Sequence, residues 1–228
     1  MTDLSPPLRL ALFDLDHTLL PFDSGMRWAR FLVEQGAIEA RFEHDYLAAC
    51  QAYVGGRINA LALHQVAASA FADRAVDAVA ALADTFGAQM AAHVPAEAHA
   101  LVARHRDEGA QCCIVSATNG VVVDQFARLL GVSEVCATAL EVVDGRYSGR
   151  LDGPICHGAE KVVRVAAWLH SLGRDWAEVA HSVFYSDACS DRPLFERCDE
   201  AVAVTPDAAL RAHAIAAGWR IADTLAAA

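Results

Sequence analysis

Long hydrophobic runs, an excess of positive charge and paired cysteine motifs are all missing from this 228-residue sequence. No apolar run approaches the roughly 20 residues that a transmembrane helix needs. The start, "MTDLSPPLRL", lacks the basic residues and apolar core of a secretory signal, so we expect a soluble protein. The 29 acidic residues outnumber the 18 basic ones, and the net charge of -11 disfavours nucleic acid and anionic membranes as partners.

The seven cysteines are odd in number and scattered, with no C-x-x-C pair and no Cys/His spacing typical of zinc. We therefore expect neither a disulfide framework nor a structural zinc site. Reduced cysteines, together with the missing signal, predict a cytoplasmic protein. No pattern in the sequence indicates an oligomeric state.

Lysine is almost absent, because 17 of the 18 basic side chains are arginine and the single exception is Lys161. Since arginine serves wherever a general positive charge is needed, the exception indicates a position that the planar guanidinium does not fit. A compact ammonium suits one phosphate or carboxylate oxygen in a tight pocket. Lys161 is therefore a candidate anion ligand, and the alternative is an ordinary position on a helix surface.

Five short apolar runs have the length and composition of strands that are buried on both faces of a parallel sheet. They are "LALF" (10–13), "CCIVS" (112–116), "VCAT" (135–138), "SVFYS" (182–186) and "AVAV" (201–204). Helical patterns alternate with them at 119–130, 160–172 and 206–217. This alternation predicts an α/β fold with a doubly wound, Rossmann-like parallel sheet.

Between the first two runs lie about ninety residues without a convincing strand pattern. Apolar residues recur there at helical spacing in four segments, 24–36, 40–56, 57–72 and 74–93. Such a block is too long for a simple crossover, so it predicts a helical cap at 21–91, inserted between core segments 1–20 and 92–228. The later stretch "LEVVDGRYSGRL" (140–151) predicts a β-hairpin that turns at Asp144-Gly145.

Polar side chains follow three of the predicted strands, in Asp14-x-Asp16-x-Thr18, Ser116-Ala-Thr-Asn119 and Asp187…Asp191. Ligands of an open parallel sheet bind beyond the carboxyl ends of its strands, so we expect the three clusters to meet. Residues two apart on an extended chain project to the same side, and repulsion should then make one of Asp14 and Asp16 resist ionisation. The alternatives are local roles, as turn residues or as helix caps.

Four segments together resemble the motifs of the haloacid dehalogenase superfamily, in the expected order: "DLDHTLL" (14–20), "VSAT" (115–118), Lys161 in "HGAEK", and "YSDACSD" (185–191). The resemblance spans most of the core, from Leu8 to about Val204. The helical insertion is similar to the C1 cap of subfamily IB, the branch that includes phosphoserine phosphatases and some histidinol-phosphate phosphatases. The resemblance implies a phosphoric monoester hydrolase that acts on a small phosphorylated metabolite.

It also implies catalytic roles for individual residues. Asp14 is then the nucleophile that forms an aspartyl-phosphate. Asp16 is the acid that protonates the leaving alcohol and the base that deprotonates the hydrolytic water. Ser116 and Lys161 are expected to hold the phosphoryl oxygens and to offset the charge that develops in the transition state.

The resemblance implies Mg²⁺ as the cofactor, which prefers hard oxygen ligands in an octahedral arrangement. The expected protein ligands are the Asp14 carboxylate, the backbone carbonyl of Asp16 and the Asp187 carboxylate. Asp191 is expected to steady a metal-bound water.

Three other functions compete with hydrolysis: long-term storage of phosphate as a phosphoenzyme, transfer of phosphate to a second alcohol, and a scaffold without activity. An acid/base only two residues from the nucleophile shortens the life of an aspartyl-phosphate, so Asp16 disfavours storage. Because Asp16 can activate a second alcohol as well as water, a phosphotransferase stays open. The complete motif set disfavours a scaffold.

The substrate is open between phosphoserine and histidinol phosphate. Asp23 lies nine residues after Asp14, where the resemblance places an acidic residue that holds the amine of phosphoserine. Arg57, in the insertion, is the candidate for the carboxylate of phosphoserine, and Thr118 and Asn119 are further candidate substrate ligands. Histidinol phosphate has the amine but no carboxylate, and it needs Asp23 without Arg57. The plainer alternatives are a helix-terminal acid at Asp23 and a surface charge at Arg57.

Overall fold

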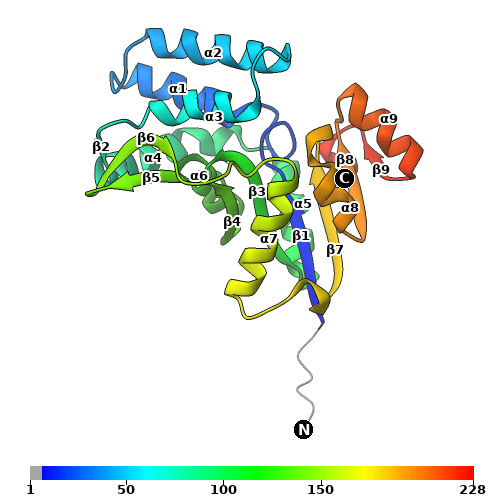
Figure 1. Ribbon diagram of the computed structural model, residues 1–228. Helices are drawn as coiled ribbons and strands as arrows, with labels where there is room; N and C mark the ends of the chain where they lie inside the picture. The colour runs from blue at the N-terminus through cyan, green and yellow to red at the C-terminus, as the bar shows by residue number, and fades with distance from the viewer. Residues whose placement is uncertain (1–6) are drawn as a thin grey trace.

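The centre of the fold is a six-stranded parallel sheet, in a computed structural model that describes residues 7–228 (Figure 1). Its strands are β1 (Leu8–Phe13), β3 (Gln111–Asn119), β4 (Glu134–Thr138), β7 (Val179–Ser186), β8 (Glu200–Val204) and β9 (Arg220–Ala222). They lie in the order β4-β3-β1-β7-β8-β9, and all neighbouring pairs are parallel. The predicted doubly wound α/β core is confirmed, with β9 as an additional strand.

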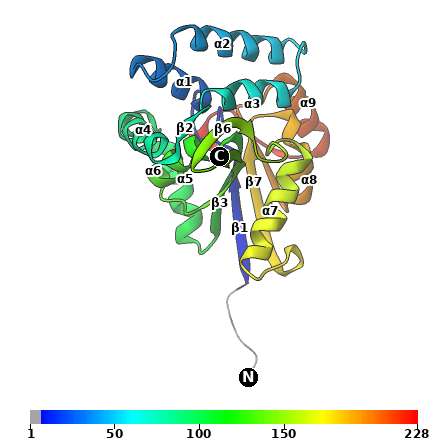
Figure 2. The ribbon, with the colours of Figure 1, turned by 60° about the vertical axis from the view of Figure 1, so that its left-hand side comes forward.

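Helices cover both faces of this sheet, because its strands are apolar on both faces. On β1, Ala11 and Phe13 belong to one buried cluster, whereas Leu10 and Leu12 belong to another. The first cluster packs against α5 (Ala96–Asp107) and α6 (Gly120–Leu130). The second packs against α7 (Ala159–Ser171), α8 (Arg192–Arg197) and α9 (Ala208–Ala217). Figure 2 shows α5 and α6 on one side of the sheet and α7 and α8 on the other.

The helical insertion after β1 also forms as predicted. It consists of α1 (Ser24–Glu34), α2 (Arg41–Val54), α3 (Ala60–Ser69) and α4 (Val76–Met90). In Figure 1, α1, α2 and α3 lie beyond the end of the sheet that is formed by the carboxyl ends of the strands. No helix among residues 7–228 combines the length and apolar composition needed to cross a membrane.

A small antiparallel sheet borders the insertion. The predicted hairpin forms from β5 (Leu140–Val143) and β6 (Arg146–Leu151), and Asp144 and Gly145 both adopt positive φ in the turn, at 49° and 74°. The two-residue strand β2 (Arg74–Ala75) pairs with β6. The prediction that no strand lies between β1 and β3 is therefore wrong, because β2 forms through a partner about seventy residues away rather than from a local pattern.

Aromatic side chains join the insertion to the core. The ring centroids of Phe86 on α4 and Phe126 on α6 are 5.9 Å apart, and Trp28 on α1 lies 5.3 Å from Phe86. These residues belong to the same buried cluster as Phe13 of β1. The cap boundaries at 21 and 91 remain a prediction, and α1 and α4 pack directly on the core.

Candidate active site

The polar clusters meet at one pocket because β3, β1 and β7 are neighbours in the sheet. Asp14 and Asp16 follow β1, Ser116 and Thr118 lie near the end of β3, and Asp187 follows β7. All five line a pocket of about 450 Å³ at the carboxyl ends of the strands. The meeting of the clusters follows from the strand order, as expected for an open parallel sheet.

Asp14 is fixed at the base of this pocket. Its backbone N–H donates to the carbonyl of Tyr185 on β7 at 2.9 Å, and its side chain is buried. Its Oδ1 accepts a hydrogen bond from Lys161 Nζ at 2.7 Å. Burial raises the pKa of Asp14 to about 6, although the ammonium of Lys161 opposes the rise. The hydrogen bonds with Tyr185 and Lys161 therefore hold Asp14 in one orientation, and the ammonium of Lys161 favours its ionised form.

Lys161 lies in the first turn of α7 and is only 2% exposed. Besides Asp14, its Nζ contacts Asp191 Oδ2 at 2.6 Å, and the same oxygen accepts a hydrogen bond from Ser186 Oγ at 2.7 Å. Burial alone would lower the pKa of Lys161, but the two facing carboxylates outweigh burial and raise it. The single lysine is thus a buried cation between two anions, not a surface charge.

Within residues 7–228, Asp16 forms no salt bridge comparable to the pairing of Asp14 with Lys161. Its Oδ2 accepts a hydrogen bond from Thr118 Oγ1 at 2.7 Å, and its Oδ1 accepts one from the backbone N–H of Ser24 at 2.6 Å. Burial, and after it the charge of Asp23, raise the pKa of Asp16 to about 6. Burial is the largest cause at both Asp14 and Asp16, and the predicted repulsion between the two acids is a smaller contribution, which raises the pKa of Asp14. Asp16 is therefore held in place, with a pKa close to neutral pH.

The oxygen atoms of this pocket fit a hard divalent cation. Thr18 Oγ1 lies 3.1 Å from Asp14 Oδ2 and 3.2 Å from Asp187 Oδ1, so one hydroxyl links two carboxylates. Burial and then the charge of Asp14 raise the pKa of Asp187 to about 7, although His17 and the hydrogen bond with Thr18 oppose the rise. Residues 7–228 contain no cluster of three or more His, Cys, Asp or Glu side chains able to hold a metal ion. Two carboxylates and a backbone carbonyl nevertheless suit Mg²⁺, which usually keeps several waters.

The candidate substrate ligands differ in whether they line the pocket. Asp23 caps α1 by accepting from the Met26 N–H at 2.7 Å, and it also lines the pocket. The buried Ser116 accepts from the Thr118 N–H at 3.1 Å through its Oγ, and both residues line the pocket. Arg57 is exposed, follows the end of α2, and is not among the lining residues within 7–228.

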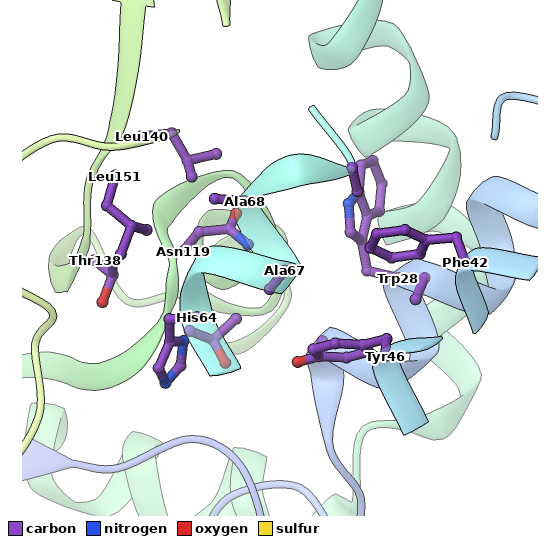
Figure 3. Close-up of a pocket in the computed structure, with 14 residues that line it drawn as sticks. Trp28, Phe42, Tyr46, His64, Ala67, Ala68, Asn119, Thr138, Leu140 and Leu151 are labelled. Carbon is purple, nitrogen blue, oxygen red and sulfur yellow. The ribbon is translucent and has the colours of Figure 1, made fainter. Parts of the chain in front are cut away.

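Asn119 lies outside the catalytic pocket as well. Its Oδ1 accepts from the Val122 N–H at 3.3 Å and caps α6. Its side chain lines a second, narrower cavity of about 10 Å³, which has room for about one water. Figure 3 shows this cavity, with Trp28, Phe42 and Tyr46 on one side and Asn119 on the other. The structure therefore places Asn119 as a helix cap beside the site.

Among the pocket residues that were not predicted as site residues are Tyr53 on α2, His64 on α3 and His157 before α7. Tyr53 Oη lies 3.2 Å from His157 Nε2, so a hydrogen bond joins the cap to the core across the pocket. Burial, and then nearby His157, lower the pKa of His64 to about 4. No motif marks Tyr53 or His64, and His157 begins the quoted segment "HGAEK" without having been assigned a role; the three residues meet only because the helical insertion packs over the core.

Known proteins resemble this chain along most of its length. A model of the haloacid dehalogenase-like hydrolases matches residues 11–196. A histidinol-phosphatase of Neisseria meningitidis is 29% identical over 224 residues, which cover 93% of this chain and 97% of that protein. Phosphoserine phosphatase SerB1 of Mycobacterium tuberculosis is 32% identical over 231 residues, which cover 97% of this chain and 74% of that protein. A solved structure of a Bordetella pertussis protein of unknown function aligns with a TM-score of 0.88 at 36% identity. The alignment covers 95% of this chain and 99% of that protein.

The matched segment runs from β1 to α8 and contains every polar cluster that meets in the pocket. The order of these clusters, the parallel core and the helical insertion agree with the match. The chain therefore belongs to the haloacid dehalogenase-like hydrolase family, as one of its phosphatases.

Proposed function

We propose that the protein is a magnesium-dependent phosphomonoesterase that works through an aspartyl-phosphate on Asp14. The observation that supports this most is the pairing of Asp14 with Lys161, which holds an ionised carboxylate at the base of the pocket. Asp16 stands beside it and is oriented by Thr118. A fixed nucleophile with a separate acid/base is the arrangement that two-step hydrolysis needs.

In the first step, an Asp14 carboxylate oxygen forms a bond to phosphorus while the bond from phosphorus to the substrate alcohol breaks. Asp16 donates its proton to the departing alcohol oxygen. In the second step, Asp16 takes a proton from water, and the water oxygen displaces Asp14 from phosphorus. The products are the free alcohol and inorganic phosphate. Ser116 and Lys161 hold the phosphoryl oxygens throughout.

Magnesium is proposed to bind Asp14, Asp187 and the backbone carbonyl of Asp16, and Asp191 is proposed to steady a water bound to it. When bound, the ion neutralises phosphoryl charge and is worth several kcal/mol in the transition state. The raised pKa of Asp187 supports this assignment, because a cation at this point relieves the crowding of two carboxylates. Asp191 also pairs with Lys161, so it acts by positioning that cation as well.

Chelation of divalent cations is expected to abolish phosphate release. With p-nitrophenyl phosphate as the substrate, EDTA should lower the rate by at least about a hundredfold, and excess Mg²⁺ should restore it. The assay measures phosphate release after dialysis against the chelator, with far-ultraviolet circular dichroism as the check on folding. Full activity in thoroughly chelated buffer contradicts a role for the metal.

Replacing Asp16 with Asn is expected to lower kcat by about 10²–10⁴-fold, because the amide can neither give nor take the proton. Both formation and breakdown of the phosphoenzyme should slow, which rapid-quench kinetics can resolve. An aryl phosphate with a good leaving group needs less protonation, so formation should slow less with that substrate. An Asp16→Asn variant with unchanged breakdown speaks against Asp16 as the base for water.

We propose a small phosphorylated metabolite as substrate, with phosphoserine and histidinol phosphate as the two candidates. The names of the two relatives support this range. Asp23 lines the pocket and is proposed to hold the amine that both candidates carry. The proposed location is the cytoplasm, which the seven free cysteines support.

A further inference from the structure

We infer that the substrate is the phosphate ester of an alcohol that carries a positively charged amine and no carboxylate. This inference rests on the proposed phosphomonoesterase function and narrows its substrate class. It follows from the charges that face the pocket, which are almost all of one sign.

Six carboxylates line the pocket, and no arginine lines it within the part of the chain that the structure describes. The acidic side chains are Asp14, Asp16, Asp23, Asp187, Asp191 and Asp207. Lys161 is the one lysine there, as it is in the whole chain. Lys161 and the proposed Mg²⁺ offset the charge of Asp14, Asp187 and Asp191, so Asp23 and Asp207 are the carboxylates that favour a positive group on the alcohol and oppose a second anion.

Lys161 cannot serve a substrate carboxylate in addition to the phosphoryl group. Its Nζ lies between Asp14 and Asp191 at 2.7 and 2.6 Å, and its side chain is buried. Both of its contacts lie at the base of the pocket, beside the proposed nucleophile. Lys161 therefore binds the phosphoryl group of the substrate, which Asp14 attacks, and not a group at the other end.

Two of the three histidines that line the pocket, His64 and His157, lie where burial disfavours the charged imidazolium. Burial, and then the proximity of His157, lower the pKa of His64 to about 4. Burial likewise lowers the pKa of His157, whose Nε2 is already within hydrogen-bonding distance of Tyr53 Oη at 3.2 Å. The remaining lining histidine, His17, is exposed to solvent. Neutral imidazoles bind a hydrogen-bonding alcohol but do not neutralise a carboxylate.

Arg57, the candidate partner for a carboxylate, is directed elsewhere. It follows the Gly55-Gly56 turn at the end of α2, and its Nη1 lies close to Gly55, 3.2 Å from the point where a Cβ would stand on that residue. The guanidinium therefore folds back on its own turn. It is exposed and does not line the pocket.

Asp23 is placed to receive the amine. One oxygen, Oδ1, caps α1, while Oδ2 accepts no hydrogen bond from any residue within 7–228. Asp23 and Asp16 line the same pocket, and the backbone N–H of Ser24, the residue after Asp23, donates to Asp16 Oδ1 at 2.6 Å, so Asp23 lies near the residue that protonates the leaving alcohol. An amine on that alcohol can thus lie between the acid/base and the cap.

The test compares O-phosphoethanolamine with O-phosphoserine, two esters that differ only in the α-carboxylate. If the pocket disfavours a carboxylate, kcat/KM should be at least about tenfold higher for O-phosphoethanolamine than for O-phosphoserine. Each ester is also measured as a competitive inhibitor of p-nitrophenyl phosphate hydrolysis. Equal or better turnover or binding of O-phosphoserine overturns the inference while leaving the phosphatase intact. Absence of any phosphatase activity, p-nitrophenyl phosphate included, instead refutes the proposed function.

Added charge at the rim provides a second, independent test. Val54 at the end of α2 lines the pocket and is 86% exposed, so Val54→Arg places a cation there without disturbing the core. It should raise kcat/KM for O-phosphoserine and lower it for O-phosphoethanolamine. The matched control is Val163→Arg, at an exposed valine outside the pocket, which should change neither value by more than about twofold. Equal effects of the two variants contradict the charge argument.

Two further variants separate Asp23 from Arg57. Asn caps helices as well as Asp does, so Asp23→Asn keeps α1 in place but removes the charge. It should raise KM for O-phosphoethanolamine by a larger factor than KM for p-nitrophenyl phosphate, which carries no amine, and equal factors for the two substrates contradict the role of Asp23. Arg57→Ala should change neither ester. A selective loss of O-phosphoserine turnover in Arg57→Ala overturns the inference.

Discussion

Asp14→Asn is expected to lower kcat by roughly 10⁴-fold or more, since the loss of a covalent nucleophile is among the largest single-residue effects in enzymes. The amide is nearly isosteric but cannot attack phosphorus. Lys161 keeps Asp191 as a partner, so the buried ammonium is not left without an anion. The measurements are steady-state kcat and intact-protein mass after acid quenching, in which the wild type should show a phosphoryl adduct and the variant none.

Asp152→Asn is the matched control, because this exposed aspartate makes the same chemical change outside the pocket. It should retain wild-type kcat. Thermal unfolding of both variants separates lost chemistry from lost structure. Near-normal turnover in Asp14→Asn excludes covalent catalysis at this residue.

Lys161→Arg is expected to lower kcat/KM by about 10²–10³-fold, even though the charge is kept. The ammonium lies between two carboxylates at 2.7 and 2.6 Å, and the side chain is only 2% exposed. A guanidinium is wider and planar, so it cannot keep both contacts in the same geometry. Overpacking should also reduce the free energy of unfolding by about 1–3 kcal/mol, which denaturant titration can measure.

The control for this exchange lies one turn along the same helix. Arg164→Lys makes the opposite change at a partly exposed position that pairs with Glu160, and surface pairs of this kind contribute at most about 1 kcal/mol. Its kinetics should match those of the wild type. If Lys161→Arg behaved like Arg164→Lys, the phosphate-binding role of the lysine would have to be abandoned.

The core strands were predictable because a strand that is buried on both faces consists of consecutive apolar residues. The runs around Phe13, Ile114 and Phe184 are apolar without alternation, and each became a central strand. Short elements contain too few residues to show such a pattern. Strand β2 has two residues and depends on β6, and the six-residue helix α8 spans fewer than two turns.

The meeting of polar residues in the pocket was predictable where they follow strands, as at Asp14 and Asp187, whereas Lys161 was marked by being the single lysine of the sequence. The surroundings were not predictable, because they depend on how the cap meets the core. Tyr53 and His157 are 104 positions apart and meet only in the folded protein. The direction in which Arg57 turns depends on the backbone after α2, which no sequence pattern specifies. The largest cause of the raised pKa of Asp16 is burial, which also depends on how the folded chain surrounds the residue and not on a local sequence pattern.

The buried lysine has a chemical consequence for the outside of the molecule. Lys161 carries the only side-chain amine in the chain, and it is enclosed by carboxylates that keep it protonated. Acylating reagents attack neutral, accessible amines, so they find no ε-amino group on the folded surface. The rate at which such a reagent labels Lys161 therefore reports how often the interior opens, and any occupant that seals the pocket slows that labelling.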